Sequence, residues 1–172
     1  MPNWLAATVS VIAGGVLTML AAWLADRRIS ERDRERRREE RNERQVMRRN
    51  EFQRETLLAL QIASQNLVRN AGASLHQDIL AHRATSIWQR QQLPPGLSDD
   101  LLRLTTETML LASRVRDDEV RVLADRLRSQ VAEIGLSSDE VEAKGRMINT
   151  VSTQTALTQR IGQLVRTLDE VD

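Results

Sequence analysis

The chain has 172 residues, of which 28% are charged and 41% hydrophobic, a proportion typical of a folded protein. It contains no cysteine, three tryptophans, one phenylalanine and no tyrosine. The absence of cysteine excludes disulfide scaffolds, thiol catalysis and thiolate zinc sites. The scarcity of aromatic residues argues against a β-sandwich or a barrel.

The formal net charge of +1 conceals three segments of different composition. Residues 1–25 carry no charged side chain, whereas residues 26–54 contain 12 arginines and 8 acidic residues. Residues 55–172 contain 13 basic and 16 acidic residues. These changes predict an all-α chain in three parts: a transmembrane helix (1–25), a charged helical stalk (26–54) and a small helical bundle (55–172).

The first segment has the length and composition of a membrane span. Its 22 residues from Trp4 to Ala25 would form a helix of ~33 Å, close to the ~30 Å of a bilayer core. Trp4 and Trp23 stand near its two ends, where indole rings favour the membrane interface. A cleaved signal peptide is the alternative, but no Lys or Arg precedes the apolar run, and the triplet Trp23-Leu24-Ala25 has a bulky residue where a cleavage site needs a small one.

The charges that flank this span predict its orientation. No Lys or Arg precedes it, while Arg27, Arg28, Arg32 and Arg34 follow it closely. The positive-inside rule therefore predicts an N-terminus outside the cell membrane and a C-terminal domain in the cytoplasm. The same arginines can contact anionic headgroups of the lipid bilayer.

Small residues recur along one face of the predicted span at a spacing of four: Ala6, Ser10, Gly14, Thr18 and Ala22. Such a row allows two membrane helices to approach closely. It predicts a homo-oligomer or pairing with another membrane protein. The alternative is that small residues are simply common in membrane spans.

The second segment is predicted to be a solvated helix. Residues 30–45 contain no aliphatic or aromatic residue and no Pro or Gly, but opposite charges recur at helical spacing, as in Glu40 and Arg44. Each such pair contributes about 0.2–0.5 kcal/mol. Because acidic residues are interleaved with the arginines and no aromatic stacking residues are present, a nucleic-acid-binding arm is not expected.

The third segment is predicted to form a bundle of three long or four shorter antiparallel helices. A turn at 93–96 precedes a helix start at 97–100, with Ser98 as the expected cap and Leu97 stapled to Leu102. Residues 116–119 form either a kink or a turn. Gly135 is expected to be a left-handed C-cap. The last helix is expected to begin at 137–140.

Apolar residues follow the helical period between these breaks. One row is Leu123, Leu127, Val131 and Ile134, and a two-heptad seam is Leu157, Ile161, Leu164, Leu168 and Val171. Gly72 marks either a close helix contact or a bend.

Residue types that carry chemistry are sparse and scattered. His76 and His82 are six residues apart and would lie about 240° apart on a helix, so they cannot share a metal ion. The acidic clusters at 99–100, 117–119 and 139–140 fall at expected helix starts, where capping explains them better than catalysis. Trp88 is expected in the core, with a partner-facing anchor as the alternative. We therefore predict no catalytic, cofactor or metal site, no enzyme and no small-molecule substrate.

This arrangement of a span, an Arg/Glu-rich helix and a helical tail resembles uncharacterised single-span membrane proteins of actinobacteria and their phages. The resemblance concerns organisation only and implies no functional residue. The sequence thus predicts a membrane-anchored interaction or scaffold protein. A membrane-permeabilising oligomer, of the holin or defence-effector kind, is the alternative.

The row of small residues can be tested by replacing Gly14. A Gly14→Leu substitution puts a bulky side chain where two backbones would meet, and a loss of ~1–2 kcal/mol would weaken association of the span roughly five- to thirty-fold. Val16→Leu lies off this face and should change little. A membrane two-hybrid assay of the span measures both, and equal association of wild type and Gly14→Leu would show that this face is not an interface.

Overall fold

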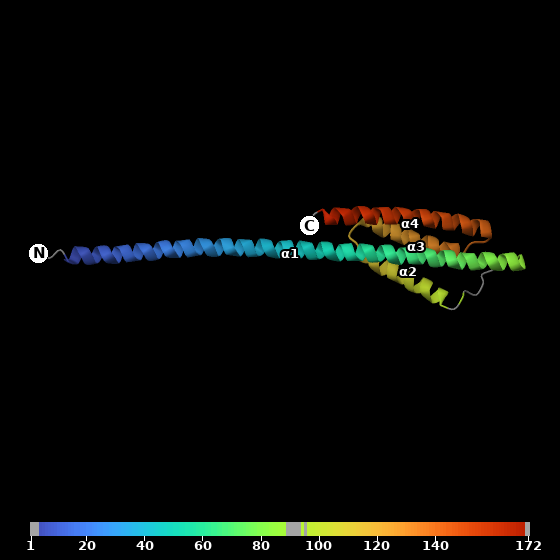
Figure 1. Cartoon of the computed structure of the whole chain (residues 1–172), viewed down its shortest axis with the longest axis horizontal. Coiled ribbons are helices and arrows are strands. Elements are labelled where there is room, and N and C mark those ends of the chain that lie inside the picture. The colour runs from blue at the N-terminus through green and yellow to red at the C-terminus, as the bar shows by residue number, and fades with distance from the viewer. Residues whose placement is uncertain (1–3, 89–93, 95, 171–172) are drawn as a thin grey trace. The chain divides into compact units, whose positions relative to one another are not determined.

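The computed structural model describes residues 4–88, 94 and 96–170, with side chains from residue 37 onward. Within this described part the chain is all-α, as predicted, with no strand (Figure 1). Its four helices are α1 (Trp4–Thr85), α2 (Leu97–Arg114), α3 (Asp118–Ile134) and α4 (Glu140–Asp169). The chain divides into two compact units, residues 1–48 and 49–172, and α1 contributes to both.

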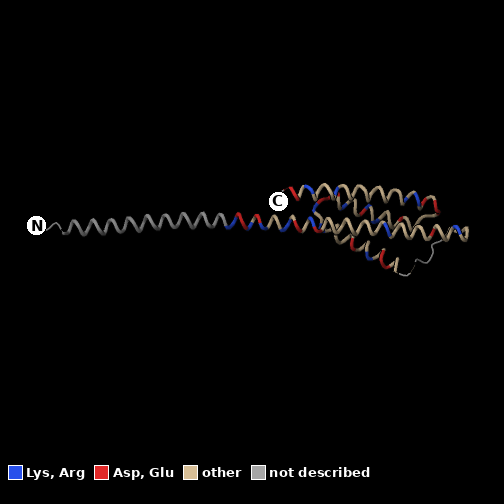
Figure 2. Tube along the Cα trace, viewed as in Figure 1, with Lys and Arg blue, Asp and Glu red and all other residues tan. Residues whose placement is uncertain are grey.

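The first unit consists of the N-terminal part of α1. Every side chain from residue 37 to residue 48 is exposed. The predicted pair of Glu40 and Arg44 is present, with 3.3 Å between Oε2 and Nη2. Figure 2 shows basic and acidic residues alternating along this stretch. Residues 37–48 therefore form a helical stretch with a charged surface and no buried side chain.

The predicted membrane span, Trp4 to Ala25, belongs to α1 but lies outside the residues whose side chains are described. Among residues 37–88, 94 and 96–170, no helix is apolar over a length that would cross a membrane.

The second unit is a bundle in which α1, α2, α3 and α4 alternate in direction (Figure 1). Contacts between α1 and α4 run in opposite directions along the two helices. Arg54 Nε lies 3.1 Å from Asp169 Oδ1, and Gln154 Nε2 donates to Ser64 Oγ at 3.3 Å. A Cβ placed on Gly72 would lie 3.3 Å from Met147 Cε. Of the two interpretations of Gly72, the close helix contact is therefore correct.

The core consists of two apolar clusters. The larger one draws on all four helices and contains Leu57, Leu60, Ala112, Val115, Val120, Ala124, Leu127, Leu157 and Ile161. The smaller one contains Ala71, Leu75, Ile134 and Ala143, with Ile79, Trp88, Leu101, Val131 and Met147 packed against it. Both predicted apolar rows therefore face the interior wherever their side chains are described. Only Val171, the last residue of the seam, lies outside that part.

Polar side chains are buried along the helices between these clusters. Ser64 and Thr150 are fully buried and Thr108 is 1% exposed. Gln154 Nε2 donates to both Ser64 Oγ and Thr158 Oγ1. Because a buried polar group must find its partner, such a layer favours one register of the helices over others.

The helix ends differ from the predictions in two places. Gly96, not Ser98, occupies the N-cap position of α2, and no side chain caps this helix. Gly96 has a φ of 86°, a conformation that glycine adopts without strain. The expected staple is also absent, since Leu102 is 70% exposed. Ser98 lies within the first turn of α2 because the chain already reverses at Gly96.

Gly135 is right-handed, with φ −69° and ψ −8°, rather than left-handed. The amides of Leu136 and Ser137 donate to the carbonyls of Glu133 and Ile134. These short-range bonds satisfy carbonyls at the end of α3, so a left-handed residue is not required. Of the turn predicted at 93–96, residues 93 and 95 lie outside the described part of the chain. Val115 to Asp117 separate α2 from α3, which makes the four-helix alternative correct, and Asp139 caps α4.

The polar layer can be tested at Thr108, whose Oγ1 is buried without a hydrogen-bond partner in the described part of the chain. Removing a hydroxyl that is desolvated and unpaired should raise the free energy of unfolding of a Thr108→Val variant by ~1 kcal/mol. Urea unfolding of the full chain in mild detergent, followed by circular dichroism, measures this.

Thr150→Val is the matched control, because Thr150 Oγ1 donates to the Arg146 carbonyl at 2.8 Å. This variant loses a hydrogen bond and should be destabilised by ~1 kcal/mol. Destabilisation of Thr108→Val to the same extent would show that its hydroxyl also has a partner.

Candidate interaction surfaces

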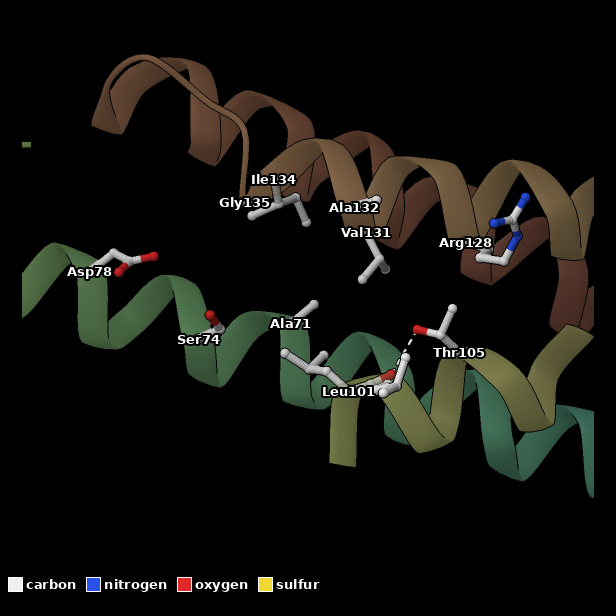
Figure 3. A pocket seen from close by; sticks show the side chains of 11 residues that line it. Ala71, Ser74, Asp78, Leu101, Thr105, Arg128, Val131, Ala132, Ile134 and Gly135 are labelled. Carbon is white, nitrogen blue, oxygen red and sulfur yellow. Dashed lines mark hydrogen bonds between the residues drawn. The ribbon is translucent and has the colours of Figure 1, made fainter. Parts of the chain in front are cut away.

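A groove with a volume of about 470 Å³ lies between α1, α2 and α3. Figure 3 shows Asp78 at one end of it and Arg128 at the other. Apolar residues line most of its length: Ala71, Leu101, Leu102, Val131, Ala132 and Ile134. Ala71, Ala132 and Gly135 are small, so the walls do not close against one another.

One end of the groove continues into a second hollow of about 290 Å³, which Trp88 lines. The indole Nε1 of Trp88 donates to the Ser137 carbonyl at 3.1 Å. Its ring meets the ring of His82 edge to face, with 5.6 Å between centroids. Trp88 also packs against the smaller core cluster. The core interpretation of this residue is therefore correct, and its polar nitrogen is satisfied by the turn before α4.

The turn between α2 and α3 is bound by side chains from the two other helices. The amide of Gln53 on α1 spans it, with Nε2 donating to the Arg114 carbonyl and the Arg116 amide donating to Oε1, both at 3.0 Å. Arg160 on α4 donates to both carboxylate oxygens of Asp117, at 2.5 and 3.3 Å. Gln53 is only 6% exposed, so these bonds form largely away from water.

Asp117 has two roles in this arrangement. It is the N-cap of α3, since its Oδ1 accepts from the Val120 amide at 2.9 Å. It also pairs with Arg160, whose Nε lies 3.0 Å from Glu119 Oε2 as well. The hydrogen bond from Arg160 is the main cause that lowers the pKa of Asp117. Burial acts in the opposite direction, and the bond from the Val120 amide lowers the pKa further.

The acidic clusters lie where capping was predicted. Asp99 and Asp100 stand in the first turn of α2, and Asp118 and Glu119 in the first turn of α3. Glu140 stands in the first turn of α4. Acidic groups are favourable there because they face the positive end of the helix dipole.

The two histidines lie in different surroundings. His76 is exposed, whereas His82 is partly buried and packs on Trp88. Among the residues with described side chains, no group of three His, Asp or Glu is placed to hold a metal ion.

The residues predicted to act at the membrane lie outside the described side chains. These are Ala6, Ser10, Gly14, Thr18 and Ala22 of the small-residue row, together with Arg27, Arg28, Arg32 and Arg34. Their predicted roles remain predictions. The seam from Leu157 to Leu168, in contrast, is described, and it packs inside the bundle. It is therefore not free to pair with another molecule.

Sequence reasoning did not find the groove. Its lining comes from three helices, and of its α2 residues the sequence analysis named only Leu102, as the staple partner of Leu97. The one available signal was the row of small residues Ala71, Gly72 and Ala73, but such residues also occur where helices pack closely.

Comparison with protein-family models, with curated proteins and with solved structures finds no match to this chain. The surfaces described above are therefore interpreted from their own chemistry.

The link between Asp117 and Arg160 predicts a pH dependence. A carboxyl whose pKa is lowered in the folded state stabilises the fold above its unfolded pKa, and this stabilisation is lost as the pH falls through the folded value. We expect Asp117→Asn to be less stable than wild type at pH 7. The difference should shrink as the pH falls below about 4.

Asparagine can still cap a helix, so this variant removes the charge and keeps the cap. Asp118→Asn is the control, because the Asp118 side chain is 84% exposed. Thermal unfolding at several pH values measures all three proteins. A constant difference between wild type and Asp117→Asn from pH 7 to pH 3 would contradict the assignment.

Proposed function

We propose that this chain is a single-span, self-associating membrane protein whose helical domain serves as an interaction or scaffold module in the cytoplasm. The observation that carries the proposal is the sequence of residues 1–54. A stretch of 25 residues without charge is followed directly by a segment with 12 arginines. This order is typical of a membrane helix with a cytoplasmic C-terminal flank.

The bundle supports the proposal by what it offers at its surface. Residues 49–172 form one compact unit with its own core. An apolar groove crosses three of its helices, and large apolar side chains are exposed elsewhere, including Val141 at 81% and Leu136 at 68%. A continuous apolar hollow such as this groove is a common feature of domains that bind other proteins.

The alternative is an oligomer that permeabilises the membrane. The row of small residues from Ala6 to Ala22 would suit it, since closely packed spans can surround a path. However, residues 4–25 include no ionisable side chain to line a conducting path. The scaffold function is therefore preferred.

Protease treatment of intact spheroplasts tests the proposed topology. We expect the chain to remain in the membrane fraction after carbonate extraction, and residues after Asp26 to be protected from protease added outside. Digestion of the bundle by protease added outside would show that the orientation is the opposite of the predicted one. Release of a soluble, shortened chain would instead favour a signal peptide. Leakage of an entrapped dye from liposomes that contain the chain would favour the permeabilising alternative.

A further inference from the structure

The groove between α1, α2 and α3 combines a buried floor with an exposed rim. Ala71 is 3% exposed and Ile134 is 6% exposed, and both belong to the smaller core cluster. Leu102 also lines the groove but is 70% exposed, and Ala132 and Gly135 of α3 are exposed as well. The groove is therefore open to water above an apolar floor. An apolar side chain that filled it would remove its own surface and that of the groove from water.

The length of the groove matches about two turns of a helix. Along α1 it extends from Ala71 to Asp78, and along α3 from Arg128 to Gly135, seven residues in each case. Such a span is ~10 Å long. On a bound helix, apolar side chains at positions i and i+4, followed by a residue at i+7, cover the same distance on one face. The groove therefore fits one face of a short helix.

The end of the groove at Asp78 is acidic. Asp78 is half-buried and lines both the groove and the second hollow. Asp99 in the first turn of α2 and Glu133 in the last turn of α3 stand at the same end of the bundle, because successive helices alternate in direction (Figure 1). Trp88 lines the second hollow together with Asp78, and an aromatic ring attracts cations. A basic side chain would therefore be bound favourably at this end.

The basic residues around the groove do not balance the acidic ones. Nη2 of Arg128, at the other end of the groove, lies 2.8 Å from Asp125 Oδ1 (Figure 3 shows the place of Arg128). Arg103 on α2 pairs with both Asp100 and Glu107, at 3.1 and 3.3 Å. Six acidic and three basic residues belong to the stretches that form the groove, which are 70–79, 97–107 and 125–135. This excess of negative charge favours a basic partner over an acidic one.

We propose that the groove binds a short amphipathic helix of another protein, which carries apolar side chains along one face and a basic residue at the end that reaches Asp78. This inference rests on the proposed function, since it names the kind of partner that the interaction module takes. The length of the groove sets the spacing of the apolar side chains, and the acidic end sets the charge. Such a contact is smaller than the ~800 Å² per partner of a standard interface, so the complex is transient.

A pair of synthetic peptides tests the charge preference. Both are fluorescein-labelled helices with leucine at positions i and i+4, and they carry either arginine or glutamate at i+7. They are added to the full chain in nanodiscs of zwitterionic lipid, with empty nanodiscs as the blank, and binding is measured by fluorescence anisotropy. We expect the arginine peptide to bind about tenfold more tightly than the glutamate peptide at low salt. This preference should decrease as the salt concentration rises, because salt screens exposed charges.

Two substitutions in the groove test its position. Ala132→Met fills part of the groove and should weaken binding of both peptides about tenfold. Ala156→Met is the matched control, because Ala156 is also an exposed helical alanine but lies on α4. Asp78→Asn should remove most of the preference for arginine without weakening the glutamate peptide. Asp118→Asn is its control, since Asp118 stands at the opposite end of α3 and its side chain is 84% exposed.

Circular dichroism checks that all four variants are folded. Equal binding of the two peptides to the wild-type chain would overturn the proposal, and so would an effect of Ala156→Met as large as that of Ala132→Met. A charge preference that survives Asp78→Asn would also contradict it. Carbonate extraction of the same chain from membranes tests the anchor independently. An anchored chain without the peptide preference would refute only the partner, whereas an extracted chain that keeps the preference would refute only the anchor.

Discussion

Side chains from α1 and α4 bind the turn between α2 and α3, and these bonds connect all four helices of the bundle. Gln53 of α1 satisfies the backbone of the turn, Asp117 begins α3, and Arg160 of α4 binds the Asp117 carboxylate. Each group is partly or fully withdrawn from water. The loss of one partner would therefore leave another polar group buried and unpaired, which costs more free energy than the bond itself contributes. Val115 within the turn is 2% exposed and joins the larger apolar cluster, so the polar links and the core fix the same arrangement.

The interior of the bundle alternates apolar clusters with polar atoms. Apolar contacts supply most of the stabilisation, but they tolerate small shifts of one helix along another. Buried hydroxyl and amide groups do not, because Gln154 Nε2 donates to Ser64 Oγ as well as to Thr158 Oγ1, and a shift of α4 along α1 would break the bond to Ser64. The close contact of Gly72 with Met147 further restricts the relative position of α1 and α4. The antiparallel pairing of these two helices follows from geometry as much as from hydrophobicity.

The surface of this unit divides into regions of different chemistry. The groove between α1, α2 and α3 is apolar along its walls and has a charged residue at each end. Residues 56–68 of α1 and residues 147–159 of α4 carry no charged side chain, and their exposed residues are both apolar and polar. The proposed anchor connects these surfaces to function. Weak contacts between chains become effective when the chains share one membrane, because the second contact is then made within an assembly that is already formed.

Local chemistry in the sequence was enough to predict much of the fold. The all-α class, the ion pair of Glu40 and Arg44, the start of α4 and the inward direction of the Leu123 and Leu157 rows could all be read from helical period, charge spacing and capping residues. These features depend on residues within a turn or two of each other. The ends at Gly96 and Gly135 were assigned wrongly, because neighbouring backbone groups satisfied the helix termini without the expected caps.

The sequence by itself thus determined the helices and the charge segments from which a membrane anchor is inferred. Only the tertiary structure decided which apolar face of each helix is covered. Leu157 and Ile148 are both large aliphatic residues of α4, yet Leu157 is fully buried and Ile148 is 69% exposed. The groove between α1, α2 and α3 and the bonds that Gln53 and Arg160 make to the turn at Asp117 all join residues that are far apart in the chain. Their positions follow from how four amphipathic helices share one core, and a single helix does not contain that information.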